Sequence, residues 1–184
     1  MYTLGLSCYY HDSALSLLKD GEIIACVQEE RFSRKKNDAR FPTKALDYLI
    51  NEYSLSNDNL KDIIFYEKPF LKFERIIETI INNAPKSLGF ALKSLPEWLG
   101  SKLNLKATLK KEFKNFGLDQ INILFSEHHF SHAAASFYTS PFADALCVTI
   151  DGVGEWSTAS IIEFNSNNVK FLKTFLFLLD ILTT

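Results

Sequence analysis

The chain has 184 residues and a formal net charge of −2, and 47% of its residues are hydrophobic. This length and composition suit one globular domain with a substantial core. The nearly balanced charge gives no electrostatic basis for binding nucleic acid or a membrane surface. The most apolar tract, 171–182, is too short to span a bilayer, and the start of the chain has no basic segment followed by an apolar one. We therefore expect a soluble, cytoplasmic protein that binds neither nucleic acid nor membranes.

The expected elements begin with short strands, in which apolar and polar residues alternate. An Asp-Gly pair at 20–21 is typical of a hairpin turn. Thr43 is expected to cap a helix that runs to about Tyr53, and 70–116 has a helical pattern interrupted by proline and glycine. Another helix is expected over 128–137, where three consecutive alanines favour it. We expect one central sheet, built from strands near Tyr2, Ser13, Glu22, Ile121, Ala145 and Thr158, and a further short strand at 62–66.

Two parts of the chain share one pattern, in which a strand, a polar loop with an aspartate, a second strand, a turn and a third strand follow one another. The first copy spans 4–25 and the second spans 146–169. A repeated pattern of this kind indicates a duplicated architecture. Two such loops facing each other across a cleft would clamp the phosphates of a nucleotide, as in actin-like ATPases. Two ordinary meanders in an α+β domain would give the same pattern.

The main candidate site combines a histidine pair with an aspartate. His128 and His132 are four residues apart, so on a helix they share one face and can hold one metal ion. The apolar run 145–150 is typical of a buried strand, and it leads into Asp151 and a turn that contains glycine. Imidazole and carboxylate groups are suitable ligands for zinc or iron. The alternative is that the histidine spacing is incidental and that the Asp-Gly pair is an ordinary turn.

Five motifs follow one another along the chain. They are GLSCYYHDSA at 5–14, QEERFSRKK at 28–36, DARFP at 38–42, EHHFSHAA at 127–134 and DGVGE at 151–155. In this order they resemble the N-terminal part of the ATP-dependent O-carbamoyltransferases, a family that modifies nodulation oligosaccharides and some antibiotics. The resemblance extends from about Tyr2 to Glu163.

The resemblance implies an α/β protein, one lobe of an actin-like (ASKHA, ribonuclease H-like) ATPase fold. It implies transfer of a carbamoyl group from carbamoyl phosphate, by way of a carbamoyl-adenylate, to a hydroxyl of a sugar or related small molecule. ATP and carbamoyl phosphate would be substrates, and Fe(II) or another divalent metal would be the cofactor. His11 would be catalytic, since imidazoles ordinarily titrate near neutral pH and suit general-base work. The resemblance also assigns metal binding to His128, His132 and Asp151, and cofactor binding to Asp12, Ser13, Gly152, Gly154, Arg31 and Lys35.

Two of these assignments have ordinary structural alternatives. Asp12 could close its own loop instead of touching a ligand. The basic residues of 31–40 could form a solvated face, although the resemblance favours an anion-binding role for at least one of them.

The chain is much shorter than the family pattern. Residues 1–164 are expected to form the N-terminal actin-like lobe. Residues 165–184 are expected to form the remnant of a hairpin, followed by a tail whose sequence is typical of translation in another reading frame. The second lobe and the C-terminal adenylate-forming domain are expected to be absent, so we expect this chain alone not to carbamoylate an acceptor from carbamoyl phosphate and ATP. Transfer from supplied carbamoyl-adenylate is the activity that stays open. One alternative is a non-catalytic fragment that acts as a homodimer or with a complementing chain. Another is an actin-like ATPase or sugar kinase, whose phosphate loops do not normally carry paired histidines.

Overall fold

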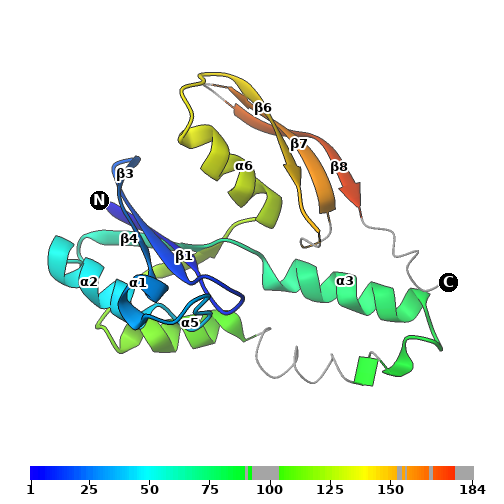
Figure 1. The fold of residues 1–184 in the computed structure, drawn as a ribbon, viewed down its shortest axis with the longest axis horizontal. Coiled ribbons are helices and arrows are strands. Elements are labelled where there is room, and N and C mark those ends of the chain that lie inside the picture. The colour runs from blue at the N-terminus through cyan, green and yellow to red at the C-terminus, as the bar shows by residue number, and fades with distance from the viewer. Residues whose placement is uncertain (90, 93–103, 153–154, 156, 166–167, 177–184) are drawn as a thin grey trace. The chain divides into compact units, whose positions relative to one another are not determined.

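The computed structural model describes residues 1–89, 91–92, 104–152, 155, 157–165 and 168–176. The chain divides into two compact units, and each has a sheet of its own (Figure 1). The first unit comprises Met1–Tyr66 and Leu105–Phe125, and the second comprises Glu67–Asn104 and Ser126–Thr184. None of the helices in the described ranges is both long and apolar enough to cross a membrane.

The first unit is built on a five-stranded sheet with the order β3-β2-β1-β4-β5. Its strands are β1 (Tyr2–Ser7), β2 (Ala14–Lys19), β3 (Glu22–Gln28), β4 (Leu60–Phe65) and β5 (Asn122–Phe125). β2 runs antiparallel to β1 and to β3, whereas β4 runs parallel to β1 and to β5. This order puts β1 at the centre of the sheet, where Leu4 and Leu6 are buried. The predicted α/β fold is confirmed, and the assignment of this fold to an actin-like lobe stays a prediction.

Helices pack against this sheet and complete its core. They are α1 (Glu29–Ser33), α2 (Thr43–Tyr53) and α5 (Leu105–Lys114). α2 contacts β2 and α5 contacts β5, each through a buried apolar stripe at helical spacing. Phe113 of α5 meets Phe41 edge to face, with ring centroids 5.2 Å apart. The fully buried residues of the core include Leu4, Leu15, Leu17, Leu46, Leu49, Ile63, Leu109 and Phe113.

The turn between β2 and β3 is the hairpin that its sequence predicts. Asp20 and Gly21 both have positive φ angles, of 51° and 93°. Two consecutive residues of this kind make the tight turn whose twist matches that of the flanking strands, and Asp-Gly adopts it readily. The expected register follows, with Lys19 opposite Glu22.

A buried glutamate from α1, and not Thr43, caps α2. Thr43 is the first helical residue, Pro42 occupies the N-cap position, and no N-cap side chain accepts a hydrogen bond. The carboxylate of Glu29 instead accepts hydrogen bonds from the backbone N–H groups of Lys44, at 3.3 Å, and Ala45, at 2.8 Å. The expected Thr43 cap is therefore wrong, because a residue 14 positions earlier takes its place through tertiary contact.

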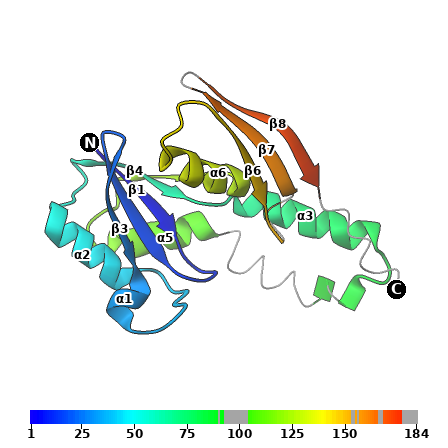
Figure 2. The same cartoon turned by 45° about the horizontal axis from the view of Figure 1, so that its top comes forward.

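The second unit contains an antiparallel sheet with the order β6-β7-β8, and its described helices include α3 and α6. The helices are α3 (Pro69–Asn82) and α6 (His128–Tyr138), and the strands are β6 (Ala145–Ile150), β7 (Ser157–Asn165) and β8 (Asn168–Leu176). α6 lies along one face of this sheet and contacts β6 and β7 (Figure 2). Ala133, Ile162 and Phe164 form the buried centre of the contact.

The prediction of one central sheet is wrong. The strands near Ala145 and Thr158, β6 and β7, pair with each other, β8 pairs with β7, and all three form the second sheet. The strand predicted at 62–66 lies inside the first sheet as β4, between β1 and β5. The reason is local. β7 forms backbone hydrogen bonds with β6 on one side and with β8 on the other, and the apolar side chains of α6 pack on the sheet, so the three strands form a core of their own. The repeated pattern corresponds to two antiparallel meanders, β1-β2-β3 and β6-β7-β8.

Replacing Glu29 with alanine is expected to destabilise the first unit by about 1–3 kcal/mol, because the part-buried N–H of Lys44 and the buried N–H of Ala45 lose their acceptor. The matched control is Glu52→Ala, which replaces an exposed glutamate of α2. Urea unfolding monitored by circular dichroism measures both free energies. Equal stability of the two variants would contradict the assignment of Glu29 as the cap of α2.

Candidate functional site

The histidine pair lies at the start of α6. His128 is the first residue of the helix and His132 lies one turn later, so both imidazoles project from the same side. Their Nε2 atoms are 3.1 Å apart, and the two rings meet almost at right angles, with centroids 4.7 Å apart. The predicted helix at 128–137 is confirmed, with one further residue at its end.

Asp151 reaches the same place from the sheet. It follows the last residue of β6, as predicted, and its backbone N–H donates to the carbonyl oxygen of Thr158 at 2.8 Å. Its Oδ2 lies 2.7 Å from Nε2 of His128. One donor atom from each of His128, His132 and Asp151 can be chosen so that all lie within 4.8 Å of one another. Two imidazoles and one carboxylate at this separation fit a divalent cation such as iron or zinc.

The electrostatics of this group favour the protonation states that bind a cation. Burial lowers the pKa of His128, although the hydrogen bond to Asp151 acts in the opposite direction. Burial alone would raise the pKa of Asp151, but the hydrogen bond from His128 and the charges of the imidazoles outweigh it and lower that pKa. A neutral imidazole and an ionised carboxylate are the forms that coordinate a metal ion. His132 is exposed, so the group is accessible from solvent.

A second carboxylate, that of Glu155, binds the backbone at the start of α6 and is not one of the three possible metal ligands. Glu155 is buried, and burial raises the pKa of its carboxyl group. One of its oxygens accepts from the backbone N–H of His128 at 3.3 Å, and the other accepts from the backbone N–H of Lys68. The ammonium of Lys68 in turn pairs with Glu127 at 2.9 Å. No spacing in the sequence predicts the role of Glu155, although the residue closes the DGVGE motif.

The predicted catalytic residue His11 lies in the loop between β1 and β2 of the first unit. Its side chain is 64% exposed, and its Nδ1 lies 2.9 Å from Oδ2 of Asp12, whose φ angle is 48°. Asp12 thus orients the imidazole. Ser13 is buried, and its hydroxyl donates to the carbonyl oxygen of Arg40. The ligand-binding roles of Asp12 and Ser13 stay predictions.

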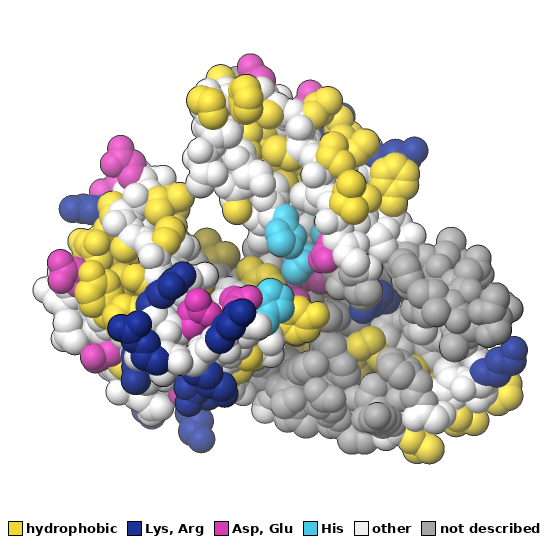
Figure 3. Space-filling model, in the orientation of Figure 1, with side chains coloured by type: hydrophobic (Ala, Val, Ile, Leu, Met, Phe, Trp, Pro, Cys, Tyr) yellow, Lys and Arg dark blue, Asp and Glu magenta, His cyan; other side chains and the backbone are white. Residues whose placement is uncertain are grey.

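The remaining predicted ligand-binding residues are Arg31, Lys35, Gly152 and Gly154. Arg31 is on α1 and Lys35 follows it, and both are exposed in the first unit, where basic side chains gather over α1 and the loop after it (Figure 3). Gly152 lies directly after Asp151, and a Cβ atom there would meet nothing within 4 Å. Gly154 lies outside the described residues. The anion-binding role of this set stays a prediction.

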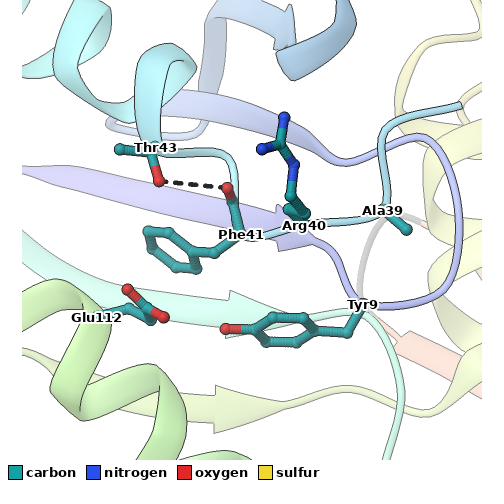
Figure 4. A pocket seen from close by; sticks show the side chains of 6 residues that line it. All are labelled: Tyr9, Ala39, Arg40, Phe41, Thr43 and Glu112. Carbon is teal, nitrogen blue, oxygen red and sulfur yellow. Dashed lines mark hydrogen bonds between the residues drawn. The ribbon is translucent and has the colours of Figure 1, made fainter. Parts of the chain in front are cut away.

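A further cavity opens beside the β1–β2 loop, with a volume of about 470 Å³. Tyr9, Ala39, Arg40, Phe41, Thr43 and Glu112 line it (Figure 4). The phenol of Tyr9 points toward Glu112 (Figure 4), and burial, with the charge of Glu112 as a smaller cause, raises the pKa of that phenol above its usual range. The guanidinium of Arg40 is fixed by the wholly buried Asp38, with Nε and one Nη donating at 2.9 and 2.6 Å. No motif in the sequence predicts this cavity.

Replacing Asp151 with asparagine is expected to lower the pKa of His128 further, because the substitution removes a negative charge that raises it. Titration of the imidazole protons of metal-free protein by NMR measures the change. Asp144→Asn, which alters an exposed carboxylate just before β6, is expected to leave the His128 midpoint in place. A rise of that midpoint in Asp151→Asn would contradict the observed hydrogen bond.

The sequence matches the protein family described as Carbamoyltransferase N-terminus over residues 2–179. An uncharacterized Synechocystis protein, sll1178, is 46% identical over 172 residues, which cover 91% of this chain and 28% of that protein. Nodulation protein NolNO of Sinorhizobium fredii is 29% identical over 167 residues, which cover 91% of this chain and 23% of that protein. The chain therefore spans about a quarter of the length of these curated relatives.

Solved structures show weaker similarity. YeaZ from Pseudomonas aeruginosa superimposes with a TM-score of 0.46 and 11% identity, covering 94% of this chain and 64% of that chain. The Ppx/GppA phosphatase of Aquifex aeolicus gives a TM-score of 0.40 and 12% identity, covering 92% of this chain and 50% of that chain. The family assignment rests on the sequence match, which extends over nearly the whole chain: the protein belongs to the Carbamoyltransferase N-terminus family.

Proposed function

We propose that this chain supplies the carbamoyl-transfer site of an O-carbamoyltransferase, and that His128, His132 and Asp151 hold a divalent cation there. The observation that carries the proposal is the convergence of two imidazoles and one carboxylate, from α6 and the end of β6, in a member of this family. The donor set suits Fe(II) or a similar ion, which would supply Lewis acidity toward a carbamoyl or phosphate oxygen.

The proposed reaction transfers the carbamoyl group of a carbamoyl-adenylate, made from ATP and carbamoyl phosphate, to a hydroxyl of a sugar or related small molecule. The hydroxyl oxygen forms a bond to the carbamoyl carbon, the bond from that carbon to the phosphate oxygen breaks, and AMP leaves. His11 takes the hydroxyl proton. Support for this role comes from its exposed imidazole, whose Nδ1 is occupied by Asp12 so that Nε2 is the nitrogen suited to accept a proton.

The other residues have binding roles in this proposal. Gly152 follows Asp151 at an open position and could let a phosphate or carbamoyl oxygen approach the backbone. Arg31 and Lys35 are exposed cations that could bind the anionic substrates. The protein would act in the cytoplasm on small molecules.

The cation site predicts stoichiometric binding of Co²⁺, a spectroscopic probe for such donor sets, at neutral pH. Removing one of three ligands in His132→Ala is expected to weaken binding by about 100-fold or more, since even residues beyond the ligands contribute 10–100-fold. Visible absorbance of the titrated protein measures the affinity. The control is His11→Ala, which removes a histidine outside the donor set and is expected to bind Co²⁺ as the wild type does. Equal affinity of His132→Ala and wild type would eliminate the site.

The transfer step predicts that carbamoyl-adenylate, supplied directly with sugar acceptors, yields carbamoylated product and AMP. His11→Ala is expected to slow product formation by about 10²–10⁴-fold, the usual contribution of a general base. Lys61→Ala, at an exposed position of β4, serves as the control and is expected to retain the wild-type rate. Mass spectrometry of the acceptor measures the product. Transfer that is unaffected by His11→Ala would refute the proposed base, and no acceptor-dependent transfer by wild type would favour a non-catalytic chain.

A further inference from the structure

The second histidine of the 127–134 motif faces away from the cation-binding group and into the protein. His129 is only 3% exposed. Its Nδ1 lies 2.8 Å from the hydroxyl oxygen of Ser160 and 3.1 Å from that of Thr149. Both partners are buried as well. One imidazole of α6 thus contacts both β6, through Thr149, and β7, through Ser160.

The two partners of His129 lie opposite each other in the sheet. Thr149 and Ser160 are direct cross-strand partners in the pairing of β6 with β7. Asp151 follows Thr149 by two residues, and its backbone N–H is bonded to Thr158, two residues before Ser160. His129 therefore attaches α6 to the sheet immediately beside the point where Asp151 leaves it.

The apolar contacts of α6 do not provide the same precision. Phe137 stacks on Phe164 with centroids 4.6 Å apart, and Phe130 stacks on the same ring at 6.1 Å. Ala133 presents only a methyl group. Stacked rings and small side chains tolerate sliding, whereas a hydrogen bond is directional and weakens steeply as its geometry changes. A slide by one residue would move the helix by about 1.5 Å, while metal–ligand bonds tolerate only about 0.2 Å.

Burying an imidazole at this position has a free-energy cost that burying an aliphatic side chain would not have. Burial disfavours the charged form of the imidazole and lowers the pKa of His129. Its Nε2 is buried and has no hydrogen-bond partner among the described residues, which carries a desolvation penalty. A leucine would fill similar space without that penalty, so the packing of α6 does not explain the imidazole. Its two directed contacts do.

We propose that His129 is a positioning residue: its hydrogen bonds to Thr149 and Ser160 set the register of α6 on β6 and β7, so that His128 and His132 meet Asp151. The inference rests on the proposed cation site for its function. It concerns the geometry of the donor atoms and not contact with the cation or substrate, because the ring is turned into the core.

The test compares three variants of the whole chain. His129→Leu removes both hydrogen bonds and keeps most of the volume, and His129→Asn keeps a polar atom near the position of Nδ1. Phe137→Leu is the matched control, since it weakens packing on the same face of α6 without touching these hydrogen bonds. Each protein is titrated with Co²⁺ well below its unfolding temperature, and its thermal midpoint is recorded.

His129→Leu is expected to bind Co²⁺ about 10–100-fold more weakly than wild type, the usual effect of losing a group that orients metal ligands. His129→Asn is expected to recover most of that loss. Phe137→Leu is expected to lower the thermal midpoint without changing the affinity, which separates positioning from stability. Wild-type affinity in His129→Leu would overturn the proposal. If His129→Leu fails to fold, the pair Thr149→Val and Ser160→Ala removes the same hydrogen bonds from the strands.

A second readout needs no metal. The ring ¹⁵N signals of His128 and His132 report whether His128 still meets Asp151 in the metal-free protein. They are expected to change in His129→Leu and to stay as in wild type in Phe137→Leu. If wild type does not bind Co²⁺, the proposed cation site fails, and these signals still decide the positioning role. Unchanged signals in His129→Leu would refute it.

Discussion

The proposed cation site depends on one contact, the 2.7 Å approach of Nε2 of His128 to Oδ2 of Asp151. This contact joins the first turn of α6 to the residue that ends β6, two elements that are adjacent in space and separated by a loop in sequence. Neither element holds the arrangement alone. Glu155 fixes the backbone at the start of α6, and the buried ring of His129 fixes the helix on the sheet. The donor group is therefore preorganised by residues that do not belong to it.

Preorganisation matters because bringing the three side chains together only when a cation binds would cost free energy. Two imidazoles whose Nε2 atoms are 3.1 Å apart repel each other when both are protonated, and burial already disfavours the charged form of His128. The structure holds the two rings together next to a carboxylate whose pKa is lowered. In the proposed site, a cation would replace the electrostatic role of the protons.

Much of the local structure could be predicted from short patterns. The Asp-Gly turn at 20–21, the helix that begins at His128 and the strand that ends before Asp151 all depend on neighbouring residues, and all were predicted correctly. The convergence of the histidine pair with Asp151 was also predictable, because helix spacing and a strand end restrict where these side chains can point. These features need only local geometry and one tertiary contact.

The failures involve residues far apart in sequence. Thr43 has a suitable side chain for a cap, but Glu29 reaches the same N–H groups from α1. The strand near Ala145 has the apolar run of a central strand, yet it pairs only with β7 within the described residues. Glu155 and His129 belong to recognised motifs, but burial and partners, which no spacing reveals, determine their roles. Tertiary contact overrides local preference at each of these positions.

X-ray absorption spectroscopy of the Co²⁺-loaded chain would test the central claim most directly. The account predicts a first coordination shell with two imidazole nitrogens and at least one carboxylate oxygen at about 2.0–2.2 Å, and loss of one imidazole in His132→Ala. A shell without imidazole scattering, or one that is identical in wild type and His132→Ala, would contradict it.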